Sequence, residues 1–155
     1  MSFEAFDTVF SKVELVGCRN LLWGQRLVLD LFEYLESDPG EEMEVGGEKV
    51  EDAHTIGLTE SSRIWRLTFE RPFAVRIRDE SLKFLEPQSN QKPQLPSRYC
   101  FAERSPWLSE VFPEAPDPRA GELTPTHYIF DLLDDFIEIL ADDTPTIEEI
   151  ENTMA

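Results

Sequence analysis

The chain has 155 residues, and acidic residues outnumber basic residues by 32 to 14, which gives a formal net charge of −18. This is the length of one ordinary domain, and the hydrophobic content of 41% suffices for a core, so we expect a single globular domain, 1–155, and exclude wholesale disorder. Because phosphate contacts need clustered lysines and arginines, the charge also excludes direct binding of nucleic acid.

The N-terminal segment predicts a helix. Phe3, Phe6 and Phe10 fall on one face at helical spacing. Ser2 stands where an N-cap residue would accept a backbone hydrogen bond. We therefore expect a first helix over residues 3–12, with its aromatic face in the core.

Residues 20–36 fit two patterns. Leu27, Leu29 and Leu31 share one face of a strand. In a helix, Val28 joins Leu27 and Leu31 on one face instead. The branched and aromatic side chains favour a strand, but the spacing leaves strand and helix both open.

Two elements are predicted between residues 38 and 62, where the chain is polar and acidic. Gly46 and Gly47 indicate a hairpin turn, because glycine adopts the positive φ angles that such turns require. A further short strand is expected over residues 53–58.

Residues 63–78 carry the clearest alternation in the chain. Apolar residues take every second position over 65–69 and again over 73–77, with the bend at residues 71–72. These two runs predict an antiparallel hairpin with one buried face. Its outer face then presents Arg66, Arg76 and Arg78.

The next elements are a loop, a strand and a short helix. Three prolines indicate a loop over residues 86–97, and a short strand is expected over 98–103. Ser105 followed by Pro106 predicts a helix over 106–112, because serine caps a helix N-terminus and proline fits its first turn.

The C-terminal segment predicts a second hairpin. Alternation over residues 126–132 and 136–141 indicates two strands joined at 133–135. Thr146 with Glu149 three residues later is a capping-box pattern, which predicts a last helical turn before the C-terminal residues fray.

These elements define the expected fold class. Short alternating strands outnumber helices, and regular strand–helix–strand units are missing from the pattern. We expect an α+β fold in which hairpins build a mainly antiparallel sheet, with the N-terminal helix and one or two short helices.

The negative charge is concentrated in two acidic blocks. Residues 30–60 hold eleven acids and one base, and residues 120–155 hold ten acids and no base. Such blocks serve solubility alone or steer a basic partner, and the lack of bases after Arg119 favours the partner. The residues that we expect to bind it are acids of the second block and one tryptophan from a proline-bounded segment: Asp131, Asp134, Asp135, Glu138, Asp142, Asp143 and Trp107.

The arginines of residues 63–78 have two interpretations. They could bind an anionic ligand, because guanidinium groups form strong paired hydrogen bonds with phosphates and carboxylates. They could instead pair across the sheet with the acidic blocks of the chain itself, which is the interpretation that we favour.

The common catalytic and metal-binding motifs are absent from the sequence. It contains no P-loop, no dinucleotide-binding glycine motif, no nucleophile elbow and no HExxH zinc motif. Cys100, His127 and Asp131 could be combined into a nucleophilic triad, but nothing in their spacing supports one. We expect no metal and no cofactor.

The N-terminus and the cysteines indicate the compartment. The first residues lack a basic region followed by an apolar one, and no apolar run approaches the roughly 20 residues of a membrane helix. Cys18 and Cys100 do not form a CxxC pair. We expect reduced, buried cysteines and a cytoplasmic protein without membrane association.

Three function classes remain. The first, which we favour, is a non-catalytic acidic protein that binds a basic protein, such as an immunity protein or antitoxin that occludes a nuclease by mimicking nucleic-acid charge. The second is a small-ligand-binding protein or enzyme whose pocket combines dispersed Arg, Asp and Glu residues. The third is a structural subunit of an oligomer.

Overall fold

The computed structural model describes residues 3–36, 41–53, 56–79, 95–113 and 124–153. Within the second range, side chains are described only for residues 46–48. The elements in these ranges are antiparallel strands and one short helix, α1 (Pro106–Val111).

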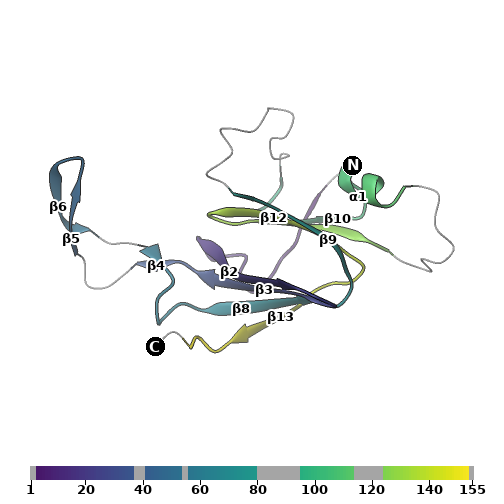
Figure 1. Ribbon diagram of the computed structural model, residues 1–155, viewed down its shortest axis with the longest axis horizontal. Coiled ribbons are helices and arrows are strands. Elements are labelled where there is room, and N and C mark those ends of the chain that lie inside the picture. Colours follow the sequence, from purple (N-terminus) through teal and green to yellow (C-terminus); the bar gives the residue numbers. More distant parts are fainter. Residues whose placement is uncertain (1–2, 37–40, 54–55, 80–94, 114–123, 154–155) are drawn as a thin grey trace.

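Two large antiparallel sheets enclose the core (Figure 1). In spatial order, the five-stranded sheet consists of β1 (Glu4–Ala5), β10 (Tyr99–Ala102), β11 (Thr126–Asp131), β12 (Asp135–Ala141) and β9 (Pro72–Asp79). The four-stranded sheet consists of β13 (Thr146–Ile150), β8 (Ile64–Phe69), β3 (Leu27–Glu33) and β2 (Val16–Trp23). Two small ribbons pair β4 (Leu35–Glu36) with β7 (Ile56–Gly57), and β5 (Glu41–Val45) with β6 (Glu48–Ala53).

The core lies between the two large sheets. Leu29 and Leu67 of the four-stranded sheet and Phe130 and Ile139 of the five-stranded sheet belong to one buried cluster. Because side chains alternate across a strand, every second residue of these strands points instead to an outer face. The two outer faces carry the polar groups that concern function.

The helix predicted over residues 3–12 is wrong. β1 pairs with β10, and the chain then forms isolated turns. The backbone N–H of Thr8 donates to Ser11 Oγ at 2.7 Å, and that of Phe10 to Thr8 Oγ1 at 3.3 Å. Side-chain hydroxyls thus take backbone donors that a helix would use. Phe10 is nevertheless fully buried, as expected, with its ring 5.5 Å from that of Trp65.

The strand favoured for residues 20–36 is confirmed. A turn at Gly24, whose N–H donates to the carbonyl of Arg26, divides the segment into β2 and β3, and β2 already begins at Val16. The turn at Gly46 and Gly47 is confirmed as well, with φ angles of 61° and 84° between β5 and β6.

The strand expected over residues 53–58 is observed in part. β6 ends at Ala53 and β7 covers Ile56–Gly57, while residues 54 and 55 lie outside the described residues. β7 pairs with β4 and not with the hairpin before it.

The strands predicted within residues 63–78 are present as β8 and β9, but their pairing as a hairpin is wrong. β8 pairs with β3 and β13, and β9 pairs with β12, so the chain crosses between the sheets at Glu70 and Arg71. The Asp143 carboxylate accepts the backbone N–H groups of Glu70 and Arg71 at 2.8 and 3.0 Å. Alternation defines the buried face of a strand but not its neighbour.

The elements from β10 to β12 agree with the prediction. β10, the β11–β12 hairpin and α1 lie where expected, and Ser105 Oγ accepts the N–H of Leu108 at 3.2 Å as the N-cap. Of the loop predicted over residues 86–97, only the part from residue 95 is described.

The last helical turn predicted at Thr146 is wrong. These residues form β13, which pairs with β8 along its whole length, and Ile147 packs against the core. All five residues of β13 stand in register with β8 and form an antiparallel ladder, whereas a capping box stabilises only one helix end. Of the C-terminal residues predicted to fray, 154–155 lie outside the described residues.

The mainly antiparallel architecture is therefore confirmed, with one short helix in the described ranges and without the N-terminal helix. Nowhere in these ranges does a helix combine the length and the apolar character that crossing a bilayer requires.

Candidate functional site

The structure separates the residues that were predicted to bind a partner. Asp131, Asp134 and Asp135 lie at the β11–β12 turn, whereas Asp142 and Asp143 follow the other end of β12. β12 has seven residues, so at roughly 3.3 Å per residue the two groups lie about 20 Å apart. The six acids therefore do not form one surface.

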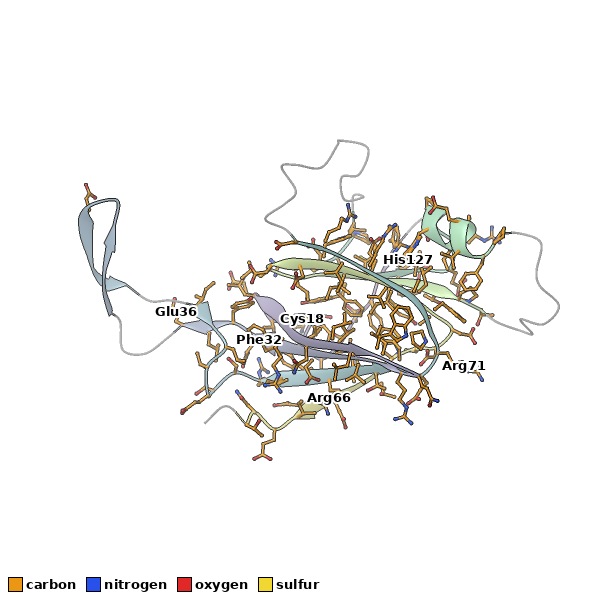
Figure 2. The ribbon with its side chains drawn as sticks, in the orientation of Figure 1. Cys18, Phe32, Glu36, Arg66, Arg71 and His127 are labelled. Atoms are coloured by element: carbon orange, nitrogen blue, oxygen red, sulfur yellow. The ribbon has the colours of Figure 1, made fainter. Side chains whose placement is uncertain are left out.

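Glu138, in the middle of β12, is the centre of a buried polar cluster. It is 2% exposed and faces away from the core, directly opposite Arg76 in the ladder. Its carboxylate accepts hydrogen bonds from Arg76 Nε, from Arg76 Nη2 at 2.9 Å and from His127 Nε2 at 3.0 Å. Figure 2 shows His127 within the five-stranded sheet, close to α1.

Glu138 is ionised at neutral pH despite its burial. Burial by itself raises the pKa of this carboxyl, but the hydrogen bonds from His127 and Arg76 outweigh burial and lower the pKa to about 2. The cluster is thus an ion pair between a buried carboxylate and a partly exposed arginine, with a buried histidine as its third member.

Helix α1 is attached to this cluster by Ser105 and Trp107. Ser105 Oγ lies 2.8 Å from His127 Nδ1. The Trp107 ring lies 5.3 Å from the His127 ring, edge to face, and 4.3 Å from the guanidinium carbon of Arg76. Because a six-residue helix is not stable alone, these contacts hold α1 in place. Trp107 thereby lies against Arg76, whose side chain is still 45% exposed.

Ser105, His127 and Glu138 are bonded in the order found in hydrolytic triads, but their environment supports a structural role. Ser105 is 3% exposed, and its Oγ also caps α1. Both ring nitrogens of His127 have partners. The adjacent cavity of about 630 Å³ has neither Ser105 nor His127 in its wall, so a substrate in that cavity would not touch the serine oxygen.

The combination of Cys100, His127 and Asp131 is not assembled. The Cys100 thiol donates to the carbonyl of Ser97 at 2.9 Å, and His127 is held by other groups. Both cysteines are free thiols, and burial raises the pKa of Cys18 to about 11. A thiol with this pKa is a poor nucleophile at neutral pH.

The pairing of arginines with the acidic blocks is confirmed. The three arginines predicted on the outer face and two neighbouring arginines each bind a carboxylate of the same chain. The pairs are Arg66–Asp30 at 2.8 Å, Arg63–Glu33 at 2.9 Å, Arg71–Asp142 at 3.1 Å, Arg78–Glu138 at 3.7 Å and Arg76–Glu138. These pairs neutralise much of the positive charge in the described part of the chain.

One end of the molecule gathers exposed carboxylates from both acidic blocks. The hydroxyl of Tyr34 donates to the carboxylate of Asp134, which joins the β3–β4 connection to the β11–β12 turn. Nearby, Asn152 donates to the carbonyls of Thr59 and Ser62 at 2.8 and 2.9 Å, which joins the C-terminal segment to the start of β8. We define the acidic end by its exposed members: Glu36, Glu60, Asp134, Glu149 and Glu151.

Gly17 allows Tyr34 to reach Asp134. A Cβ atom on Gly17 would lie 2.5 Å from Cε2 of Tyr34 and 2.9 Å from Cζ of Phe32, so any larger residue would displace these rings. Burial and the carboxylate of Asp134 both raise the pKa of Tyr34, so its hydroxyl remains a hydrogen-bond donor.

The β5–β6 hairpin lies beyond the acidic end. Figure 1 shows it standing away from the two large sheets, past β4. Residues 41–53 contain six acids and one lysine, and Glu48 at the turn is exposed. The hairpin therefore extends the negative charge outward.

The opposite end of the molecule is different in charge. There, Arg26 pairs with Glu70 at 2.9 Å, and Arg71 pairs with Asp142 at 3.1 Å. Figure 2 shows Arg71 at this end and Glu36 at the acidic end. The acids of the opposite end are thus partly neutralised.

Sequence analysis missed Tyr34 and Gly17. Tyr34 and Asp134 are 100 residues apart in the chain, and no local pattern links residues at that separation. The signal that was available is the presence of two acidic blocks, which does not say whether they meet.

Within the described ranges, no three His, Cys, Asp or Glu residues are placed to hold a metal ion. Comparison of the chain with protein-family models, with curated proteins and with solved structures finds no match.

Proposed function

We propose that the protein is a non-catalytic interaction protein whose acidic end binds a basic protein partner. The contact between Tyr34 and Asp134 carries this proposal, because it brings the two acidic blocks to one end of the molecule. A cluster of like charges raises the local potential and steers an oppositely charged protein into contact.

The distribution of arginines supports the same surface. At the opposite end Arg26 and Arg71 each hold a carboxylate, so the field there is weaker. At the acidic end, Arg63 pairs with Glu33 and also interacts with Glu149, and Arg98 is exposed beside the β11–β12 turn. The five exposed acids that define this end outnumber these two arginines. With a net charge of −18, the electrostatic potential is therefore most negative at the acidic end and along the β5–β6 hairpin.

A protein that occludes a nuclease is one form of this function. The active site of a nuclease is basic because it binds phosphates, and exposed carboxylates can occupy the same site. Of the residues predicted from the sequence, Asp134 belongs to the proposed surface, and Asp131 and Asp135 are half-buried in the same turn. Glu138 and Trp107 serve the attachment of α1, and both Asp142 and Asp143 lie at the opposite end.

The test is capture of a partner from the native lysate with two charge-matched variants. The first variant neutralises the acidic end by Glu36→Gln, Asp134→Asn and Glu151→Gln. The second neutralises exposed acids elsewhere by Glu4→Gln, Glu103→Gln and Glu110→Gln.

We expect a basic protein that is retained by the wild type at low salt and released at high salt. Titration of that protein should show binding about tenfold weaker for the first variant and nearly unchanged for the second. Equal losses in both variants, or no basic protein retained at low salt, would refute the proposal.

A further inference from the structure

A cavity of about 240 Å³ opens at the acidic end, between the start of β2 and the β11–β12 turn. Arg98 and Asp131 contribute charged groups to its wall, and the rest of the wall consists of Leu15, Val16, Tyr99, Leu132 and Leu133. At about 30 Å³ per water, this volume corresponds to about eight waters, which is enough for one long side chain.

The backbone around this cavity is already hydrogen-bonded. The N–H of Leu133 donates to the carbonyl of Val16 at 3.0 Å, and the N–H of Asp131 donates to the carbonyl of Arg98 at 2.8 Å. These two N–H groups are therefore not available to an occupant, which meets apolar side chains, one carboxylate and one guanidinium.

We propose that this cavity receives one basic side chain of the partner, with its aliphatic stem against the leucines and its charged head toward the acids of the turn. This inference rests on the proposed function. Lysine and arginine bury their stems along apolar surface while their charge stays near water. A pocket filled by one such residue at the centre of a charged surface is a typical hot spot of protein recognition.

Arg98 provides a way to identify the charge of the occupant. It is exposed, and its guanidinium donates to the carbonyl of Glu14, which fixes it beside the cavity. A cationic head group in the cavity is repelled by Arg98, so removing this charge strengthens its binding.

The first experiment compares two probes, oligolysine and an oligomer of diaminobutyrate of equal length, whose side chains carry the same charge on a shorter stem. At pH 6, where both are charged, the wild type should bind oligolysine about fivefold more tightly, because the longer stem reaches the leucines. Leu133→Ala should reduce this preference to about one. Leu22→Ala, at an exposed leucine near the far end of β2, should keep it.

The second experiment removes one positive charge at either end. Arg98→Gln should bind oligolysine about threefold more tightly than Arg26→Gln, whose side chain is exposed at the opposite end. Melting temperatures of all variants confirm that they remain folded.

The outcomes separate the two proposals. Salt-dependent binding of both probes without preference for the longer stem overturns the cavity inference and leaves the acidic end as a binding surface. The same holds if Leu133→Ala behaves like Leu22→Ala. If oligolysine does not bind at low salt, both proposals fail.

Discussion

The outer faces of the two large sheets each bury one carboxylate, but they surround it differently. Asp30 on the four-stranded sheet and Glu138 on the five-stranded sheet are each 2% exposed. Each stands directly opposite an arginine of the neighbouring strand, Arg66 and Arg76 respectively. The antiparallel register thus creates the same pair on both faces.

The two pairs differ in their second partner. Glu138 also accepts a hydrogen bond from His127 at 3.0 Å and lies beneath α1. Asp30 has Arg19 as its second neighbour, with the charged atoms 3.8 Å apart, and Arg78 takes the equivalent place 3.7 Å from Glu138. The described partners of Asp30 thus resemble those of Glu138 except for His127, through which the pair on the five-stranded sheet also anchors a helix.

The largest expected effect is the loss of the helix anchor. Glu138→Gln should lower the free energy of unfolding by about 3 kcal/mol at neutral pH, because Arg76 and His127 lose a buried carboxylate. Urea unfolding measures this change, with Glu148→Gln as the control at an exposed acid of β13. A similar loss in both variants would show that the cluster does not stabilise the fold.

The pH dependence of stability tests whether the charge of Glu138 is responsible. Its pKa falls from the ordinary glutamate value of 4.5 to about 2 in the folded chain, so folding favours the ionised form. The stabilisation is therefore complete above about pH 4.5 and is lost as the pH falls toward 2.

We expect this loss to amount to about 2–3 kcal/mol, measured by urea unfolding between pH 6 and 2. Arginine hydrogen bonds also lower the pKa values of Asp30 and Glu33, so these residues contribute in the same direction. The difference between the wild type and Glu138→Gln should shrink as the pH falls. A difference that stays constant would exclude ionised Glu138 as its source.

The positions of the strands could be predicted because alternation of apolar and polar residues is a local pattern. The strand with which each one pairs could not be predicted. Alternation over residues 63–78 and 126–141 identified β8, β9, β11 and β12. The crossing between sheets depends on Asp143, which is 73 residues from Glu70. Aromatic spacing misled the prediction for residues 3–12, since Phe10 enters the core from a turn as readily as from a helix.

The candidate site was predictable only as a charge pattern. The two acidic blocks and their pairing with arginines follow from composition, because a buried carboxylate needs a cation. The sequence does not show that β12 carries Asp135 to one end and Asp142 to the other. It also does not show that Glu138, between them, faces away from the core and binds Arg76 and His127, the two residues that Trp107 contacts.

A smaller effect is expected on the four-stranded sheet. Asp30→Asn should lower the free energy of unfolding by about 1–2 kcal/mol. The arginines on the two faces are similarly exposed, at 41% for Arg66 and 45% for Arg76, so the smaller loss reflects the buried histidine and the covering helix that only Glu138 has among the described residues. Urea unfolding of Asp30→Asn and Glu138→Gln under the same conditions shows which of the two carboxylates contributes more to the free energy of unfolding. A loss as large as that of Glu138→Gln would mean that the cover by α1 adds nothing.

The smallest expected effect comes from removing the second partner of each carboxylate, Arg19 beside Asp30 and His127 beside Glu138. The Nε atom of Arg19 is buried without a hydrogen-bond partner, so Arg19→Met, which keeps much of the aliphatic stem, should change the free energy of unfolding by less than about 0.5 kcal/mol. The matched change on the other face, His127→Leu, removes bonds to Ser105 and Glu138 and should cost about 2 kcal/mol. Both are measured by urea unfolding at pH 7. Equal costs would show that the second partner matters alike on both faces, and the anchoring of α1 would then have to come from Trp107 and Arg76 alone.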